Sequence, residues 1–486
     1  MQDHPRYPRQ LDRIPHCWID SAGQAGAGAA RDLIDPATGQ AFATYRDADG
    51  NQAGQAVASA KAALPGWADT PPAERAAALF RLATLLDQNA DRLAAVESLN
   101  AGKPISQAKR DVRRAADYFR FYAGACDKLN GESIPLGPDQ TAFTLLEPVG
   151  VTAHILPWNY PVSTLARGAA PALAAGSTVV AKPSELTPLT AILTAKLASE
   201  AGLPAGAFNV VTGAGETGAA LASHRDVAHV TFTGSTATGR KIMQSASKPI
   251  AGTTLELGGK SPVVVLADAD LDAAAAGVAR GIFFNAGQVC AAGARLVCEA
   301  SVHDALVDKV IAKAEAMTIG HGLDDPDMGP LISATQLERV QGFVDRAKAE
   351  GFTCVTGGSR IFPEKLSAGN FFAPTVIADV PAEAEIARQE VFGPVLATQK
   401  CHSADEALAL ANGTRFGLVA GIYTADTTQA MRFARKAEAG QVFVNGFLKG
   451  GDTVPFGGVK ESGIGREKGL LGISAYCAVK SIVLNH

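Results

Sequence analysis

The 486-residue sequence lacks a strong excess of charge of either sign. Its 44 Lys and Arg residues stand against 48 Asp and Glu residues, which gives a formal net charge of −4 at pH 7. General attraction to nucleic acid or to an anionic membrane surface requires a large positive potential. We therefore expect no nucleic-acid partner and no membrane partner.

Paired cysteines are also missing. The chain has seven scattered cysteines and no C-x-x-C pair: Cys17, Cys126, Cys290, Cys298, Cys354, Cys401 and Cys477. This spacing argues against a disulfide framework and against a metal site, and it is typical of a reducing compartment.

Long apolar runs are absent as well. The longest alanine-rich stretch, residues 273–294, is interrupted by Arg280, Asn285 and Gln288 and is too polar to cross a bilayer. The first residues contain no apolar signal-peptide core. The expected location is the cytoplasm.

The pattern that is present is an alternation of strands and helices. Residues 53–127 have helical spacing, and two extended segments flank Gly137-Pro138-Asp139, which predicts a hairpin over residues 129–148. Further along, apolar segments of strand length alternate with helical ones: strands at 150–156, 177–182, 208–211, 229–232 and 253–257, helices at 163–176 and 188–201. A second alternating region covers about 262–458. The prediction is an α/β protein with parallel, doubly wound sheets.

A glycine-rich turn follows the predicted strand at 208–211. Gly213, Gly215 and Gly218 fit the G-x-G-x-x-G fingerprint of a dinucleotide-binding turn. That fingerprint also requires an acidic residue at the end of the next strand, but Thr233 and Gly234 stand there. The spacing alone therefore favours an ordinary tight turn.

The turn after that strand is a better phosphate candidate. In F-T-G-S-T-A-T-G-R-K, residues 232–241, Ser235 stands where a helix begins, and free N–H groups at a helix start favour an anion. A P-loop is disfavoured, because Arg240 and Lys241 occupy the positions of the required Lys and Ser or Thr. An ordinary N-capped helix is the alternative.

Six motifs are specific as a set. They are L-P-W-N-Y-P (156–161), A-K-P-S-E-L-T-P (181–188), L-E-L-G-G-K-S-P (255–262), F-N-A-G-Q-V-C (284–290), E-V-F-G-P (390–394) and P-F-G-G-V-K-E-S-G-I-G-R-E (455–467). In this order they resemble the aldehyde dehydrogenase superfamily, and among its members the non-acylating oxidisers of betaine aldehyde, aminoaldehydes and aromatic aldehydes.

The resemblance implies three structural parts. These are a Rossmann-like cofactor domain (1–125 and 149–258), an α/β catalytic domain (259–458) and a small β oligomerisation arm (126–148 and 459–486). The expected assembly is a homodimer or a homotetramer.

The resemblance also implies a catalytic set. Cys290 is the nucleophile, since a thiolate adds to an aldehyde carbonyl, whereas Cys298 is expected to pack in the core. Asn159 and the Cys290 N–H hold the oxyanion, and Glu256 is the base for thioester hydrolysis. Glu467 is expected on the solvent side as a proton carrier. The alternatives are a turn role for Asn159 and an ion pair of Glu256 with Lys260.

The implied cofactor is NAD, with NADP as the alternative. A carboxylate at Glu185 beside the ribose would repel a 2′-phosphate. The implied contacts are Ile155, Leu156, Trp158, Lys182, Ser184, Glu185, Gly215, Phe232, Gly234, Ser235, Thr238, Leu257, Glu390 and Phe392.

A substrate tunnel is expected to contain Tyr160, Arg167, Phe284, Phe447 and Phe456. The sequence departs from the family at Arg167 and at Gly168, where many relatives have a lysine that assists proton transfer. If Arg167 faces the tunnel, it favours a semialdehyde or a substituted aromatic aldehyde over a quaternary ammonium substrate. The alternative is that Arg167 forms a surface ion pair.

Three other functions compete with aldehyde oxidation by water. A variant that transfers the acyl group to coenzyme A is disfavoured by Glu256. A non-catalytic binding or structural protein is disfavoured by the complete set of Cys290, Glu256 and Asn159. A cysteine hydrolase requires a histidine partner, and none of the nine histidines lies in these motifs.

Overall fold

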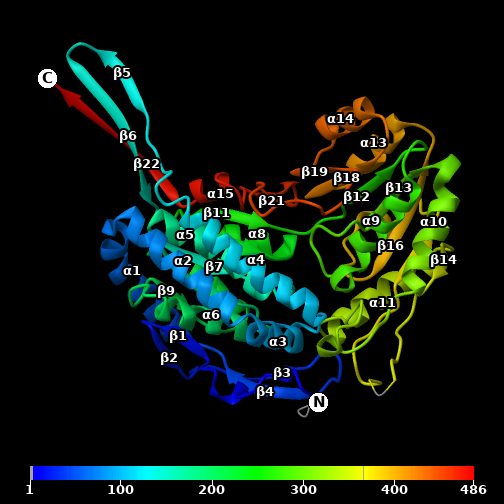
Figure 1. The fold of residues 1–486 in the computed structure, drawn as a ribbon, viewed down its shortest axis with the longest axis horizontal. Coiled ribbons are helices and arrows are strands. Elements are labelled where there is room, and N and C mark those ends of the chain that lie inside the picture. The colour runs from blue at the N-terminus through cyan, green and yellow to red at the C-terminus, as the bar shows by residue number, and fades with distance from the viewer. Residues whose placement is uncertain (1–3, 365) are drawn as a thin grey trace.

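The computed structural model describes residues 4–364 and 366–486. Two β-sheets with helices on both faces form the body, and a long hairpin projects from it (Figure 1). The expected α/β fold with two sheet regions and a β arm is confirmed.

The first sheet has the strand order β2-β1-β9-β8-β7-β10-β11-β21. Its bounds are β1 Cys17–Ile19, β2 Ala22–Gln24, β7 Val151–Ile155, β8 Thr178–Lys182, β9 Phe208–Val210, β10 Val227–Thr233, β11 Gly252–Glu256 and β21 Gly463–Ile464. The five central strands, β9-β8-β7-β10-β11, are parallel. Strands buried on both faces read as continuous apolar runs, which is why these segments could be recognised in the sequence.

Helices cover both faces of this sheet. One face carries α1 (Gly50–Asp69), α7 (Gly215–Ala222) and α8 (Thr236–Ala246), which enclose a core with Val151, Ala153, Ile155 and Val180. The other face carries α5 (Pro161–Ala175) and α6 (Leu189–Glu200), and behind them lie α2 (Pro72–Gln88), α3 (Ala90–Ala101) and α4 (Ile105–Ala123). The helical prediction for residues 53–127 is confirmed.

The second sheet has the order β14-β15-β16-β13-β12-β18-β19. Its bounds are β12 Pro262–Val265, β13 Arg295–Glu299, β14 Thr353–Thr356, β15 Thr375–Ala378, β16 Val395–Cys401, β18 Val419–Tyr423 and β19 Gln441–Val444. A core on one face includes α9 (Leu271–Phe283), α10 (Ala300–Glu315) and α11 (Ala334–Ala349), and a smaller core on the other includes α13 (Ala404–Asn412) and α14 (Thr427–Lys436). Cys298 is fully buried here, as expected.

The hairpin arm consists of β5 (Ser133–Gly137), β6 (Gln140–Pro148) and β22 (Cys477–Asn485). The turn lies at the predicted Gly137-Pro138-Asp139. The C-terminal part of the arm begins later than residue 459, because β20 (Val459–Lys460) pairs with β17 (Phe416–Gly417) and β21 pairs with β11. In the described part of the chain, no helix combines the length and apolar character that crossing a membrane requires.

Phe447 corrects one expectation from the sequence. It belongs to the core of the second sheet, is 2% exposed, and does not line the substrate cavity described below. Its ring fills the space left by three glycines, since a Cβ added at Gly281, Gly293 or Gly421 would lie 2.7, 2.9 or 2.5 Å from it. Its side chain points into the domain, whereas its neighbour Leu448 reaches the cavity.

We predict that Phe447→Ala lowers the free energy of unfolding by about 3–5 kcal/mol, because it leaves a cavity in a packed core. Urea unfolding monitored by circular dichroism measures this change. Phe362→Ala, the same truncation at a side chain that is 62% exposed, is the control and should have little effect. An equal effect of both substitutions would contradict the core assignment.

Candidate active site

The loop that carries Cys290 has an unusual backbone. Asn285 and Ala286 have φ values of 52° and 53°, and Gly287 has 70°. Left-handed backbone costs a non-glycine residue about 1–2 kcal/mol, so the loop must be held by its surroundings. A Cβ at Gly287 would collide with the carbonyl of Gly393. The motifs at 284–290 and 390–394 are therefore in direct backbone contact.

Cys290 lies at the wall of a cavity and is half-buried. Its carbonyl oxygen lies so close to Gly259 that a Cβ there would collide with it. Burial raises the pKa of the Cys290 thiol to about 12, with Arg167 acting in the opposite direction. The thiol is therefore protonated at neutral pH and needs a base before it can act as a nucleophile.

Asn159 is held beside this loop by three contacts. Its side-chain Nδ2 donates to the carbonyl of Gln288 at 2.8 Å. Its own carbonyl accepts from Lys103 Nζ at 2.7 Å and from Asn285 Nδ2 at 3.4 Å. Lys103 is buried and also binds Asp111 at 2.6 Å. These contacts hold the carboxamide of Asn159 against Gln288, which precedes Cys290 by two residues in the sequence.

Glu256 is the last residue of β11 and is 1% exposed. Neither of its carboxylate oxygens has a hydrogen-bond partner in the described chain. Burial raises the pKa of Glu256 to about 8, Glu467 adds to this shift, and Arg167 opposes it. A buried carboxyl without partners, with a pKa near neutral pH, is suited to accept and release a proton.

The alternative pairing of Glu256 with Lys260 is not found. Lys260 Nζ is buried and also lacks a hydrogen-bond partner among the described residues. Burial lowers the pKa of Lys260 to about 7, Arg295 adds to this shift, and Glu390 opposes it. The carboxylate that acts on Lys260 is thus Glu390.

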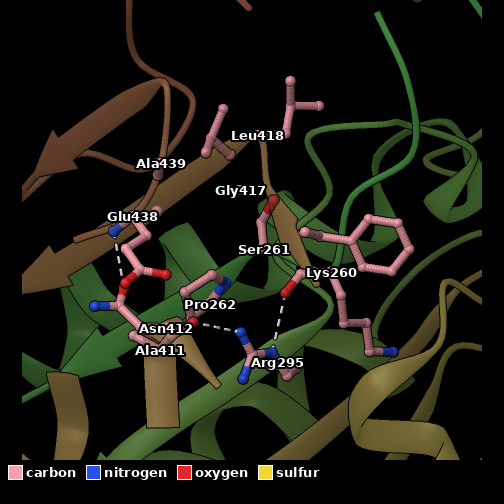
Figure 2. A pocket seen from close by; sticks show the side chains of 13 residues that line it. Lys260, Ser261, Pro262, Arg295, Ala411, Asn412, Gly417, Leu418, Glu438 and Ala439 are labelled. Atoms are coloured by element: carbon pink, nitrogen blue, oxygen red, sulfur yellow. Dashed lines mark hydrogen bonds between the residues drawn. The ribbon is translucent and has the colours of Figure 1, made fainter. Parts of the chain in front are cut away.

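Lys260 also lines a cavity of about 10 Å³ that is separate from the cavity of Cys290 (Figure 2). Arg295 holds this region together, donating to the carbonyls of Lys260 at 2.9 Å, Leu410 at 2.7 Å and Ala411 at 2.8 Å. The space suffices for about one water molecule. Lys260, Ser261 and Pro262, at the end of the 255–262 motif, are among its lining residues.

Arg167 and Glu467 form a buried ion pair, which corrects the expectation that Glu467 lies on the solvent side. Glu467 is 3% exposed and does not lie on the solvent side. Arg167 lines the cavity, but its guanidinium is paired with Glu467 inside the protein and not at the surface. Its Nη2 also donates to Thr233 Oγ1 at 3.2 Å. Burial raises the pKa of Glu467, and Arg167 opposes that shift.

The residues expected to contact a cofactor lie along one edge of the first sheet. Ile155 is in register with Lys182 and with Phe232, and Thr233 is in register with Glu256. The carboxyl ends of parallel strands form the ligand-binding edge of such sheets, at the point where strand order reverses. Here the order reverses between β7 and β10, so the loops 156–160 and 234–235 flank that point.

Ser235 caps α8 as the sequence predicted, with Oγ accepting from the N–H of Thr238 at 3.2 Å. Gly234 N–H donates to the carbonyl of Glu256 at 3.0 Å, and Leu257 packs under Gly239. The N-terminus of α8, an eleven-residue helix, therefore lies at the point where strand order reverses. A helix N-terminus in this position suits a phosphate group.

The glycine-rich turn lies one strand further out, after β9. Lys182 Nζ donates to the carbonyls of Pro183 at 2.9 Å and Gly213 at 2.8 Å, so it ties this turn to the end of β8. The side chain of Glu185 is 40% exposed, with its carboxylate 4.0 Å from Lys182. Ser184 Oγ accepts from Leu186 N–H, and Leu156 N–H donates to Lys182 at 3.0 Å.

Glu390 and Phe392 approach the same edge from the second sheet. Glu390 accepts a hydrogen bond from Gly259 N–H at 2.9 Å, and burial raises its pKa to about 7. Phe392 packs edge-to-face on Trp158 with ring centroids 5.3 Å apart. The two sheets therefore meet where β7 and β11 end.

The cavity that contains Cys290 has a volume of about 190 Å³. It brings together the expected Tyr160, Arg167, Phe284 and Phe456. Its other walls, which the sequence did not indicate, come mainly from α4, from β19 and from the loop after β19: Arg110, Asp111, Arg114, Tyr118, Ser163, Thr164, Arg280, Val289, Ala291, Gln441, Phe443, Leu448, Gly450, Gly451, Asp452 and Lys468. The available signal was Arg110, Arg114 and Tyr118, which share one face of a predicted helix at spacings of four.

The fold and the site define an α/β class of protein in which a dinucleotide-type sheet edge lies beside a cavity with a free cysteine in its wall. The model of the aldehyde dehydrogenase family matches residues 23–482. A protein from Burkholderia cenocepacia assigned to the aldehyde dehydrogenases is 44% identical, with 97% of this chain and 99% of that chain covered and a TM-score of 0.95.

Two further structures were determined with NAD+. Indole-3-acetaldehyde dehydrogenase of P. syringae is 39% identical, with coverages of 97% and 96% and a TM-score of 0.95. Betaine aldehyde dehydrogenase of Staphylococcus aureus is 35% identical, with coverages of 98% and 96% and the same TM-score. The chain belongs to the aldehyde dehydrogenase family, and the expected family, fold and enzyme class are confirmed.

The raised pKa of Glu256 predicts a pH dependence. A base acts in its deprotonated form, so aldehyde turnover should rise by about tenfold per pH unit below the pKa and level off above about 8. Steady-state rates between about pH 6 and pH 10 measure this limb. Glu256→Gln should remove it together with most of the activity, and the exposed Glu438→Gln should leave it unchanged. A flat profile in the unmodified enzyme would contradict the assignment.

Proposed function

We propose that the protein oxidises an aldehyde to a carboxylic acid with NAD, through a covalent thioester on Cys290. The observation that carries this proposal is the position of Glu256. Its buried, unpartnered carboxylate stands at the end of β11, at the dinucleotide-type edge of the first sheet, and is close enough to Cys290 for its charge to act on the thiol.

In the first step Cys290 Sγ passes its proton to the neighbouring carboxylate of Glu256 and bonds to the aldehyde carbon. The developing oxyanion is held by Asn159 Nδ2 and the Cys290 N–H, and each such donor contributes about 2.7–4 kcal/mol to catalysis. NAD, when bound, supplies the acceptor for the hydride that leaves the same carbon. Once Glu256 has passed its proton on, it takes a proton from the water whose oxygen bonds to the thioester carbon. The C–S bond then breaks, which frees the Cys290 thiolate and the carboxylic acid.

The residues at the sheet edge fit this cofactor. Ser235 and the free N–H groups of α8 suit the pyrophosphate, with Ile155, Leu156, Trp158, Phe232, Gly234, Thr238 and Leu257 along its path. Lys182, Ser184 and Glu185 suit the adenosine ribose, and Glu390 with Phe392 suits the nicotinamide half. The accessible carboxylate of Glu185 favours NAD over NADP, because it would repel a 2′-phosphate.

The competing functions fit the site less well. No histidine lines the cavity in the described chain; His154 and His229 are buried and bind Thr152 and Thr254. A cysteine hydrolase would therefore lack its base. Transfer to coenzyme A would not use a buried base such as Glu256, and a non-catalytic role leaves the assembled site unexplained.

Three further proposals concern the assembly, the location and the path of the proton. The arm exposes Ile134, Leu136, Leu145, Val479 and Val483, and apolar residues on a projecting sheet favour pairing with another copy. We therefore propose a homodimer or homotetramer. The seven free cysteines support a reducing, cytoplasmic location, and Glu467, paired with Arg167, is proposed to pass the proton of Glu256 onward.

The function is tested by the absorbance of NADH with a panel of aldehydes at about pH 8, near the pKa of Glu256. We expect NADH to form with at least one aldehyde, and Cys290→Ala to abolish it. Cys298→Ala, a truncation at a core cysteine, is the control and should retain activity. The absence of NADH with every aldehyde would refute the proposal.

Gly215 tests the path of the cofactor. A Cβ there would meet no protein atom within 4 Å, so Gly215→Val should not disturb the fold. We expect KM for NAD to rise roughly tenfold, because crowding a ligand costs about 1–3 kcal/mol. Gly50→Val is a matched control, since Gly50 is also the first residue of a helix and also has open space around it. An unchanged KM would remove the turn at 213–218 from the cofactor site.

A further inference from the structure

The Cys290 cavity carries more positive than negative side chains. Five cations line it: Arg110, Arg114, Arg167, Arg280 and Lys468. Only two carboxylates, Asp111 and Asp452, do so. A cleft dominated by one sign of charge concentrates ligands of the other sign. Only cations that are not already paired with a carboxylate of the protein can act on a ligand.

The carboxylates around the cavity form ion pairs with only some of its cations. Asp111 binds Lys103 at 2.6 Å, Asp452 binds Arg114 at 3.0 Å, and Glu467 binds Arg167. Both lining carboxylates and Glu467 are therefore already paired. Within the described ranges, Arg110, Arg280 and Lys468 form no ion pair at 4.0 Å or less.

These three cations approach the cavity from different elements. Arg110 is on α4 and Arg280 is on α9, so the two arginines come from the two halves of the body (Figure 1), and both are exposed. Lys468 follows Glu467 and lies half-buried. Two aromatic walls of the cavity hold cations: the Arg110 guanidinium is 5.4 Å from the ring of Phe284, and Lys468 Nζ is 4.9 Å from the ring of Phe456.

We infer that the physiological substrate is an aldehyde with a carboxylate at its far end, selected by Arg110, Arg280 and Lys468. This inference rests on the proposed aldehyde oxidation and specifies its substrate class. The aldehyde carbon reaches Cys290 while the carboxylate stays toward the exposed arginines. Arg167, neutralised by Glu467, is not the selecting charge, and a quaternary ammonium aldehyde is disfavoured by all three free cations.

The test compares two aldehydes that differ in charge and little in shape, 4-formylbenzoate and 4-formylbenzamide. We expect kcat/KM to be about tenfold or more higher for the anion, as expected for a focused field. The ratio should fall toward one when the Debye length is cut from about 30 Å to about 3 Å by raising salt from about 0.01 M to about 1 M. Equal values for the two aldehydes at low salt would overturn the inference and leave the oxidation itself intact.

Single variants locate the effect. Arg110→Gln, Arg280→Gln and Lys468→Gln should each lower the ratio of the two kcat/KM values by about threefold to tenfold. Arg113→Gln is the control, since Arg113 is an exposed arginine on the same helix and does not line the cavity. A ratio that follows Arg113 as strongly as Arg110 would refute local selection by the cavity.

Binding gives a readout that does not need turnover. Isothermal titration of Cys290→Ala with each aldehyde should give a Kd about tenfold lower for 4-formylbenzoate. Equal Kd values would overturn the inference. Failure of the proposed oxidation would show separately, as the absence of NADH from both aldehydes in the unmodified enzyme.

Discussion

The active site depends on backbone segments that touch without side chains between them. Gly259 allows the carbonyl of Cys290 to approach the end of the first sheet, and Gly287 allows the left-handed loop to lie against Gly393. Any Cβ at these positions would force the segments apart. Because Glu256 precedes Gly259 by three residues and Glu390 precedes Gly393 by three, the same contacts bring Cys290, Glu256 and Glu390 together. Close packing thus sets the chemistry.

Electrostatics then divides the roles among the buried groups. Glu256, Glu390 and Glu467 all have raised pKa values, because burial disfavours their charged forms. A single guanidinium, Arg167, pairs with Glu467 and opposes the shifts of Glu256 and of Cys290. Glu256 is left as the carboxyl without partners, so its proton is the one free to move. The ion pair of Arg167 is therefore a local condition for the base and not a contact kept for substrate.

The sequence predicted the structure correctly where a feature depends on a local pattern of residues. The strands around Val151 and Thr178, the hairpin turn at Pro138 and the cap at Ser235 all follow from residues close in sequence. It failed where a side chain's direction depends on distant segments. Phe447 and Leu448 are adjacent in an apolar loop, and only the glycines at 281, 293 and 421 decide that Phe447 enters the core. Glu467 was expected in solvent because nothing nearby in sequence shows that Arg167 covers it.

The sequence by itself determined the succession of strands and helices along the chain, the family, and which residues stand at the strand ends. Periodicity and short motifs are properties of neighbouring residues, so these features could be recognised without the structure. The tertiary structure decided which of those ends meet. The glycine fingerprint at 213–218 lies after β9, away from the reversal between β7 and β10, so strand order and not the motif makes Ser235 the better candidate for a phosphate contact. The tertiary structure also decided the charge of the cavity. Ion pairs such as that of Arg114 with Asp452 join residues 338 positions apart, so only the folded chain shows which cations remain free.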